Sequence, residues 1–331
     1  MNSKSVIFAA GFILGMGTTP LMAQVQAATN AKESVLIDIA GNKVPVVQGG
    51  LYDRYRSNPP LSVIASEAPD VDLSWFKQLK KEKVDIGFES YSPNFYYKTS
   101  RVSAIYTADI DRLRALMPAD VMKVVQPLQI WPGRGVVAVT AYTYHYCDND
   151  SYNEVAISIV TNKPGSWNMG PISLMGQSLS KDFWGYVLKL PVDTELARVR
   201  GVVGYNLPKW LTQIAVNDSR DALSYEIKNA QTGEMDLRID TRKLDKVSAE
   251  VELVTNSFTN TDHQGRLTQG YAVARQLQHG SSTDASMVSL QLGKGALSDL
   301  IRSLDLGKML KYEYVPDFQS ALYAPARLPG F

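Results

Sequence analysis

The chain has 331 residues, of which 45% are hydrophobic and 20% are charged, a composition typical of a folded protein with a large core. Its 34 basic and 33 acidic residues leave a net charge of +1, and no basic block breaks this balance, which argues against nucleic acid as a partner. Because Cys147 is the only cysteine, no intrachain disulfide can form, and we expect Cys147 to be a structural residue.

The first predicted element is a secretory signal peptide at residues 1–27. Lys4 precedes the apolar run VIFAAGFILGMG, and AQVQA supplies small residues suited to cleavage. The apolar run is shorter than the roughly 20 residues of a membrane-spanning helix. We therefore expect a periplasmic or secreted protein that has no stable membrane span after cleavage.

Residues 28–85 are expected to form an N-terminal extension. The stretch SVLIDIAGNKVPVV predicts a hairpin with its turn at Gly41 and Asn42. A polar stretch with prolines follows, and a short helix is expected at residues 73–81. A single domain is predicted for residues 86–331, because no repeat or long linker divides them.

Strands dominate this predicted domain. VSAIYTA and GVVAVTAYTYHY alternate and are rich in β-formers, and DIDRLRALMP between them predicts a short helix that ends before Pro118. NEVAISIVT is expected to pair with the second of these strands, and LSDLIRSL predicts an amphipathic helix. Further strands are expected at residues 224–228, 236–241, 247–255, 270–278 and 286–292. The sequence thus predicts a mainly β (α+β) fold of antiparallel strands.

The stretch GVVGYNLPKWLTQIAV places Lys209 in an apolar neighbourhood. A lysine amine is a nucleophile only when it is neutral, and an apolar pocket walled by Tyr205 and Trp210 favours the neutral form. The alternative is a surface lysine whose stem covers Trp210 while its ammonium group stays in water.

The backbone around Lys209 is expected to be helical. Asp193 is placed to cap a helix that begins at Thr194, and Gly204 is expected to break it. Pro208 suits the first turn of a second short helix, with Lys209 at its start.

Other catalytic chemistries have weaker support in the sequence. The three histidines are scattered, and neither HExxH nor a zinc-ligand spacing occurs. No phosphate loop and no GxSxG nucleophile motif is present. SWFK and SLSK match the SxxK of penicillin-interacting enzymes, but the downstream KTG is missing. No metal and no cofactor is predicted.

LPVDTELARVRGVVGYNLPKWL resembles the active-site segment of the acetoacetate decarboxylase superfamily, in which a Pro-Lys pair carries the Schiff-base lysine. TADIDRLRALMP is similar to the family's early helix, and SYNEVAISIV to the strand that brings a glutamate into its cavity. The resemblance spans residues 96–325. It implies a closed antiparallel β-barrel or cone with a flanking sheet and a few short helices.

By position, the resemblance implies that Lys209 is the Schiff-base lysine and Glu154 the acidic catalytic residue. Trp210 stands where the decarboxylase has a second lysine, so desolvation alone is left to activate Lys209. The match to the decarboxylase's other cavity glutamate falls on Val139.

The decarboxylase's arginine, which lies in the region that holds the substrate carboxylate, has its match near Thr99. Lys98 or Arg101 is therefore expected to bind the substrate, with Tyr205 and Trp210 lining the pocket. One-residue offsets in a strand point to opposite faces, so the two basic residues are alternatives.

The implied function is that of a carbon-carbon lyase, which decarboxylates a small β-keto acid through an imine on Lys209. Its expected partners are the keto acid and further copies of the chain in a homo-oligomer. One alternative is an imine-dependent aldolase or dehydratase acting on a pyruvate-like substrate. Another is a non-catalytic secreted protein that binds small acids.

Overall fold

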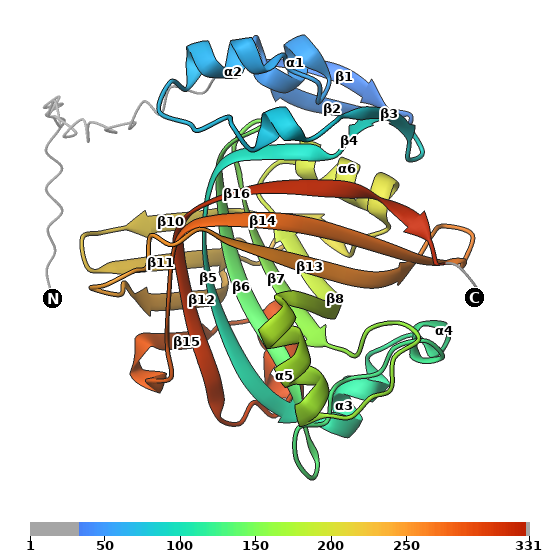
Figure 1. Cartoon of the computed structure of the whole chain (residues 1–331), viewed down its shortest axis with the longest axis vertical. Coiled ribbons are helices and arrows are strands. Elements are labelled where there is room, and N and C mark those ends of the chain that lie inside the picture. The colour runs from blue at the N-terminus through green and yellow to red at the C-terminus, as the bar shows by residue number, and fades with distance from the viewer. Residues whose placement is uncertain (1–32, 329–331) are drawn as a thin grey trace, which may run out of the picture. The chain divides into compact units, whose positions relative to one another are not determined.

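The computed structural model describes residues 33–328, and the predicted signal peptide at residues 1–27 lies outside them. A closed barrel of seven strands forms the centre of the described part (Figure 1). Its strands, in order around the barrel, are β13 (Glu252–Thr261), β14 (Leu267–Ser282), β16 (Met309–Arg327), β5 (Asn94–Asp109), β6 (Arg134–Cys147), β7 (Tyr152–Val160) and β8 (Asp182–Val192).

The barrel confirms the predicted closed β-barrel, with one difference in strand direction. Six neighbouring pairs are antiparallel, but the pair that closes the barrel, β13 with β8, is parallel. A parallel pair needs a crossover connection rather than a tight turn, and 59 residues separate the end of β8 at Val192 from the start of β13 at Glu252. That connection carries a second sheet.

The two faces of the barrel strands differ in chemistry because side chains alternate along a strand. On β6, Val137, Val139 and Ala141 face outwards into the largest apolar cluster. Tyr142, on the other face, packs with Ala274, Val315 and Phe318 of β14 and β16. The main core therefore lies outside the barrel, and the barrel interior is lined in part by polar and aromatic side chains.

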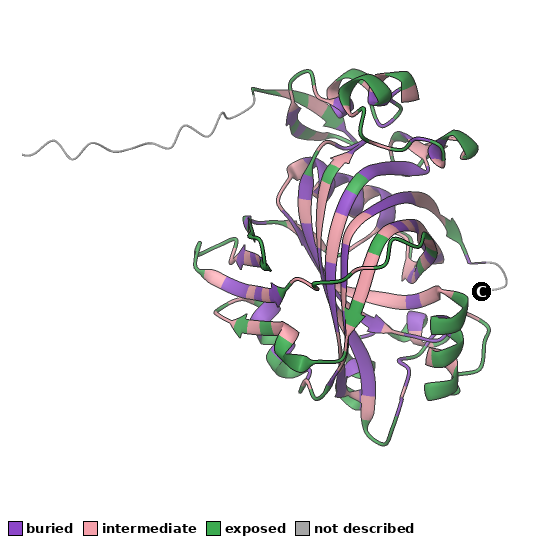
Figure 2. Cartoon of the chain, turned by 60° about the vertical axis from the view of Figure 1, so that its left-hand side comes forward, coloured by how far each residue is buried: buried purple, intermediate pink, exposed green. Residues whose placement is uncertain are grey.

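A four-stranded sheet covers this outer face. It consists of β10 (Ile214–Asp218), β11 (Ala222–Lys228), β12 (Met235–Arg242) and β15 (Val288–Leu292). The 3-10 turn η2 (Ala285–Met287) precedes β15, and α3 (Ile110–Ala115) and α4 (Ala119–Met122) follow β5. Figure 2 shows buried stretches along the long barrel strands and exposed ones on the helices and turns.

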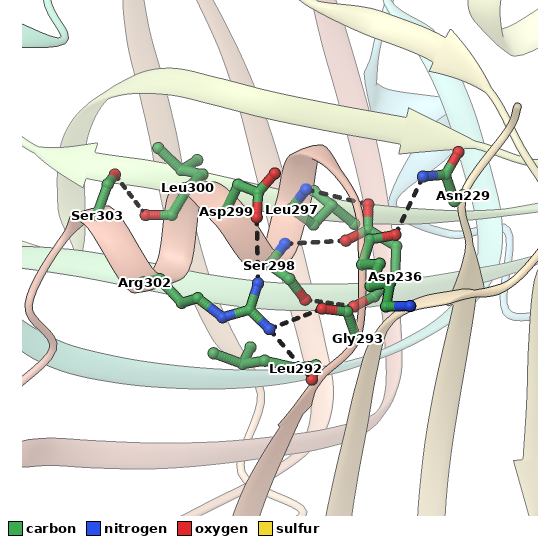
Figure 3. A network of polar contacts seen from close by, with 11 residues as sticks. Asn229, Asp236, Leu292, Gly293, Leu297, Ser298, Asp299, Leu300, Arg302 and Ser303 are labelled. Atoms are coloured by element: carbon green, nitrogen blue, oxygen red, sulfur yellow. Dashed lines mark hydrogen bonds and ion pairs between the residues drawn. The ribbon is translucent and has the colours of Figure 1, made fainter. Parts of the chain in front are cut away.

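Helix α7 (Ala296–Ser303) is fixed to the second sheet by one aspartate (Figure 3). The carboxylate of Asp236, on β12, accepts from the backbone N–H groups of Leu297 and Ser298 at 3.0 and 2.9 Å. These N–H groups belong to the first turn of a helix and have no partner within it. The predicted apolar side of this helix is confirmed, since Leu297, Leu300 and Ile301 are buried.

The described part of the N-terminal extension packs against the rest of the structure. The predicted hairpin is confirmed as β1 (Ser34–Ile39) and β2 (Asn42–Val47). Its turn consists of Ala40 and Gly41 rather than Gly41 and Asn42, because Asn42 already pairs with Ile39. The helix expected at residues 73–81 is only a 3-10 turn, η1 (Phe76–Gln78). The extension also contains four elements that were not predicted: α1 (Leu51–Tyr55), α2 (Leu61–Glu67), β3 (Glu82–Asp85) and β4 (Glu89–Ser92).

A buried arginine ties this extension to helix α6 (Glu195–Tyr205). Arg200 donates to the hydroxyl of Tyr52 on α1 at 3.2 Å and to the hydroxyl of Ser90 on β4 at 3.1 Å. Apolar residues of β2 and α1 pack on the same helix at Leu196 and Val199. The extension therefore supports α6 from outside.

The backbone around Lys209 differs from the prediction. Thr194 caps α6, its hydroxyl accepting from the N–H of Ala197, and the helix continues through Gly204. Lys209 does not start a helix, because residues Lys209–Leu211 form the short strand β9, which pairs in parallel with β8. Packing beside β8 outweighs the helix-starting preference of Pro208.

Three long elements had no clear sequence signal. They are β8, β16 and helix α5 (Pro171–Ser180), and the strand expected at residues 247–255 begins only at Glu252. Among residues 33–328, no helix is both long enough and apolar enough to cross a membrane.

Candidate active site

Lys209 and Glu154 form an ion pair between two strands. Nζ of Lys209 lies 2.5 Å from Oε2 of Glu154, and each side chain is only 8% exposed. Strand β8 lies between them: Glu154 on β7 is opposite Val192, and Lys209 on β9 is opposite Leu190. The structure thus brings together the two residues predicted to be catalytic.

Three tyrosines surround this pair. Tyr144 donates a hydrogen bond to Oε1 of Glu154 at 3.0 Å, and Nζ of Lys209 lies 5.7 Å from the centre of the Tyr152 ring. The Tyr144 ring is 4.6 Å from that of Tyr96 and 4.5 Å from that of Tyr152. Burial, together with the nearby Glu154 carboxylate, raises the pKa of Tyr144 and Tyr152 well above the ordinary value. Both phenols therefore stay protonated and able to donate.

The stem of Lys209 lies against a glycine of α6. A methyl group at Gly201 would stand 2.5 Å from Cε of Lys209 and no farther from Cδ. Real carbon contacts are longer, so only glycine leaves room for the lysine in this position. The N–H of Leu207 also donates to the carbonyl of Gly201 at 3.1 Å, which fixes the loop before Lys209.

Trp210 points away from the ion pair. Because it follows Lys209 in a strand, its side chain lies on the opposite face, where it packs against the main core outside the barrel. Nζ of Lys189 lies 5.8 Å from the centre of its ring. Trp210, expected to line the pocket, thus lies behind the strand that carries Lys209.

The other predicted binding residues are spread over three places. Tyr205 is buried at the end of α6, and burial raises its pKa to about 12. Lys98 is half exposed and pairs with Asp70 at 2.6 Å, away from Lys209. Arg101 lies in the same cross-strand row as Tyr142 and Glu154, so it faces the barrel interior.

Arg101 already has an acidic partner. Its guanidinium lies 3.0 Å from Glu313 on β16, and both side chains are largely buried. Burial acts to raise the pKa of Glu313, but the charges of Arg101 and Lys311 outweigh it and hold the pKa at about 2. The barrel interior therefore contains two ion pairs, on either side of Tyr142.

Val139, which stands at the position matched to the decarboxylase's other glutamate, faces away from Lys209. Its side chain is buried in the outer core, whereas the next residue, Thr140, faces inwards and shares a 2.7 Å hydrogen bond with Ser103. Thr99, the match near the decarboxylase's arginine, is buried and donates to the carbonyl of Phe318. Within residues 33–328, Glu154 is the carboxylate that contacts Lys209.

A pocket of about 430 Å³ opens beside the start of β9. One edge of β8 pairs with β13 over Asp182–Gly185 and with β9 over Leu190–Val192. In the described chain no strand pairs with that edge at Tyr186–Lys189. These residues line the pocket together with Asn206, Leu207, Pro208, Asn260 and Thr261.

Residues 33–328 offer no sign of a metal centre. Within the described residues, no three His, Cys, Asp or Glu side chains are grouped closely enough to hold an ion. Cys147 ends β6, is fully buried and donates to the carbonyl of Asp150 at 2.8 Å. Burial raises the pKa of its thiol well above the ordinary value, which suits the expected structural role.

No protein-family model and no curated protein sequence matches the chain. Solved structures do match it. Acetoacetate decarboxylase from Legionella pneumophila aligns with a TM-score of 0.51 and 16% identity over 71% of this chain and 87% of its own. The chain has the acetoacetate decarboxylase fold. The enduracididine biosynthesis enzyme MppR aligns with a TM-score of 0.50 and 13% identity, over 72% and 88% of the two chains.

The candidate site also contains residues that were not predicted from the sequence. Tyr96, Tyr144, Tyr152 and Gly201 were not among the predicted site residues. The run AYTYHY carried a signal for Tyr144, because it places aromatic hydroxyl groups at every second residue of a strand. Gly201 had no such signal. Its role is to leave space for the side chain of Lys209, which folds back onto the helix from eight residues later in the chain.

Proposed function

We propose that this protein is a Schiff-base-forming lyase that decarboxylates a small β-keto acid through an imine on Lys209. The observation that carries the proposal is the buried 2.5 Å contact between Lys209 and Glu154 inside the barrel. A buried amine next to a single carboxylate has both groups that imine formation needs, a nucleophile and a proton carrier.

The first steps follow from this pair. Glu154 accepts a proton from Lys209, and the neutral amine attacks the ketone carbon to form a carbinolamine. Glu154 then returns the proton to the leaving hydroxyl, which departs as water and leaves a protonated imine. A positioned acid or base of this kind contributes roughly 10²–10⁴-fold to the rate.

Carbon-carbon cleavage then uses the imine as the electron sink. The bond between the α-carbon and the carboxylate breaks, carbon dioxide leaves, and the electron pair forms an enamine. Protonation of the enamine carbon and addition of water release the ketone and restore Lys209. Tyr144 holds Glu154 in place by its 3.0 Å hydrogen bond throughout.

Arg101 supports binding of an acid. It lies on the inner face two strands from β7, and strands are spaced about 4.8 Å apart, so its long side chain can reach a carboxylate held near Lys209. Its contact with Glu313 has to loosen for this.

A second imine reaction is also compatible with the site. The site has one carboxylate at Lys209 and none at Val139, which also suits an aldolase or dehydratase acting on a pyruvate-like acid. Product analysis separates the two, since a decarboxylase releases carbon dioxide and an aldolase consumes an aldehyde.

The test of imine formation is reductive trapping. The protein is incubated with acetoacetate or pyruvate and sodium borohydride, digested, and examined by mass spectrometry. We expect an adduct on Lys209, and its loss in Lys209→Met. Lys189→Met is the matched control, because Lys189 lies nearby on the outer face and its removal should leave the adduct unchanged.

Absence of an adduct with every acid tested would contradict the mechanism. Ligand binding that survives in Lys209→Met, without turnover in the unmodified protein, would point instead to a non-catalytic binding protein. We also propose that the protein acts outside the cytoplasm, on the basis of residues 1–27. N-terminal sequencing of the protein from its native host tests this, with residue 28 expected first.

A further inference from the structure

Helix α5 buries a glutamine, Gln177, against the barrel, whereas three of its apolar residues, Ile172, Met175 and Leu179, are exposed. Gln177 is buried: its amide donates to the carbonyl of Thr161 at 2.7 Å and accepts from the N–H of Trp184 at 3.2 Å. The helix is thus held by the side chain of a glutamine rather than by an apolar stripe. This is the reverse of an ordinary surface helix, which buries its apolar side.

The apolar side of α5 continues onto neighbouring loops, and we call this surface the α5 face. Its members are Trp131, Trp167, Met169, Ile172, Met175 and Leu179, which are between 44% and 87% exposed. With roughly 200 Å² for a whole side chain of this size, on the order of 700 Å² is exposed. Monomers rarely expose so large an apolar patch, and it approaches the about 800 Å² that each partner buries in a standard interface.

The charge pattern narrows the choice of occupant. Residues 164–180 contain no charged residue, and a charged protein partner would be matched by opposite charges around the patch. A helix that lies on a membrane usually carries Lys and Arg on its polar side, whereas the buried polar residue here is Gln177. The charges nearest to the face are Lys163 and Lys181 at the two ends of this stretch and Arg114 in the adjoining hollow. A face whose centre is uncharged is compatible with a second copy of itself, because no like charges meet there.

The same face contains a projection and a hollow. Trp167 is 87% exposed. Beside it lies a hollow of about 480 Å³. Its lining is partly apolar, from Ile130, Trp131, Pro132 and Met169, and partly polar, from Arg114, Gln126, Gln129 and Asn168. In a two-fold symmetric dimer, each copy contributes the same patch, so a projection on one copy meets a hollow on the other.

We propose that the α5 face is the interface of a two-fold symmetric homodimer, in which Trp167 of each copy enters the hollow beside Trp131 of the other. Aromatic residues and Met are the residues enriched in such interfaces. Gly176 lies on the same helix, and nothing in the same copy lies within 4 Å of the position of an added Cβ.

Sedimentation velocity on the mature protein tests the dimer. We expect a dimer at about 10 µM and a dissociation constant raised by at least 100-fold in Leu179→Glu, because a buried charge without a partner is costly. Trp167→Ala should weaken the dimer by about 10-fold or more. Leu36→Glu is the matched control, because Leu36 is a similarly exposed leucine on β1 and should leave the dimer intact.

Cross-linking gives an independent measurement. Cys147 is buried, so a cysteine introduced by Gly176→Cys is the accessible thiol in that variant. Oxidation should yield a covalent dimer from Gly176→Cys and a monomer from Leu36→Cys. Circular dichroism confirms that each variant is folded.

Two outcomes would overturn the proposal. One is a wild-type protein that stays monomeric at about 100 µM, including one that co-sediments with phosphatidylcholine vesicles through the α5 face. The other is a dimer that Leu179→Glu leaves unchanged or that Leu36→Glu weakens equally. None of these measurements depends on turnover, so they are independent of the proposed lyase activity.

Discussion

The stem of Lys209 lies so close to Gly201 that any larger side chain at residue 201 displaces it. The two residues belong to β9 and α6, and the loop between them returns the chain onto the helix. The position of the Lys209 amine therefore depends on the absence of a side chain at residue 201 as much as on the ion pair with Glu154.

Gly201→Ala should impair catalysis more than stability. The added methyl group moves the lysine stem, and a shift of about 1 Å at a reacting group can cost about 100-fold in rate. The measurement is kcat with the best keto acid, together with the rate of borohydride trapping. Gly176→Ala is the matched control: it is also a helical glycine, nothing lies near its added methyl, and we expect unchanged turnover with about 0.5–1 kcal/mol of added stability.

Glu154→Gln should abolish most turnover and also destabilise the fold. It removes the proton carrier and leaves the amine of Lys209 buried without its carboxylate. Breaking one partner of a buried pair costs about 3–5 kcal/mol. Urea unfolding measures this loss, and the double variant Lys209→Met with Glu154→Leu should recover most of it. Equal stability of the single and double variants would contradict the assigned pairing.

Tyr144→Phe should change the pH profile of the reaction as well as stability. It removes the hydrogen bond to Oε1 of Glu154, and a bond to a charged acceptor contributes about 1.5–3 kcal/mol. Tyr96→Phe is the comparison, because it removes only the 3.2 Å contact with the hydroxyl of Tyr152. A pH profile of kcat that moves in Tyr96→Phe but stays fixed in Tyr144→Phe would argue against Tyr144 as a positioning residue.

The protein should lose stability below pH 4.5 in part through Glu313. The pKa of its carboxyl group is about 2 in the fold, against 4.5 ordinarily. As the pH falls from about 4.5 to 2, the unfolded chain takes up the proton first, so the stabilisation present above pH 4.5 is lost. This difference corresponds to about 3 kcal/mol. The measurement is the free energy of unfolding at a series of pH values between 6 and 2. It should fall less steeply with decreasing pH in Glu313→Gln than in the control Glu234→Gln, which changes an exposed glutamate.

The strands and short helices with strong local patterns were predictable from sequence. The run GVVAVTAYTYHY predicted β6 because its side chains alternate in character, as they do in a strand whose two faces have different surroundings. The apolar residues between 297 and 301 predicted α7 because they recur at helical spacing. These elements are determined by local sequence, so one sequence is enough to find them.

The elements set by distant contacts were not predictable. Residues 209–211 extend because β8 lies beside them, and α5 is a helix that a buried glutamine amide fixes in place. The resemblance implied catalytic roles for Lys209 and Glu154, but their direct contact is visible only in the folded structure. The prediction that Trp210 lines the pocket was wrong because residues 209–211 form a strand instead of the expected helix. In a strand, successive side chains point to opposite faces.

Strand β8 also has a consequence for the order of folding. Glu154 and Lys209 are 55 residues apart and meet only when β8 has paired with β7 on one edge and with β9 on the other. Contacts of such high sequence separation form late, because loop closure has to precede them. A refolding chain should therefore recover strand content before it recovers the capacity to trap a keto acid, and the delay between the two signals would measure the time that the site takes to assemble.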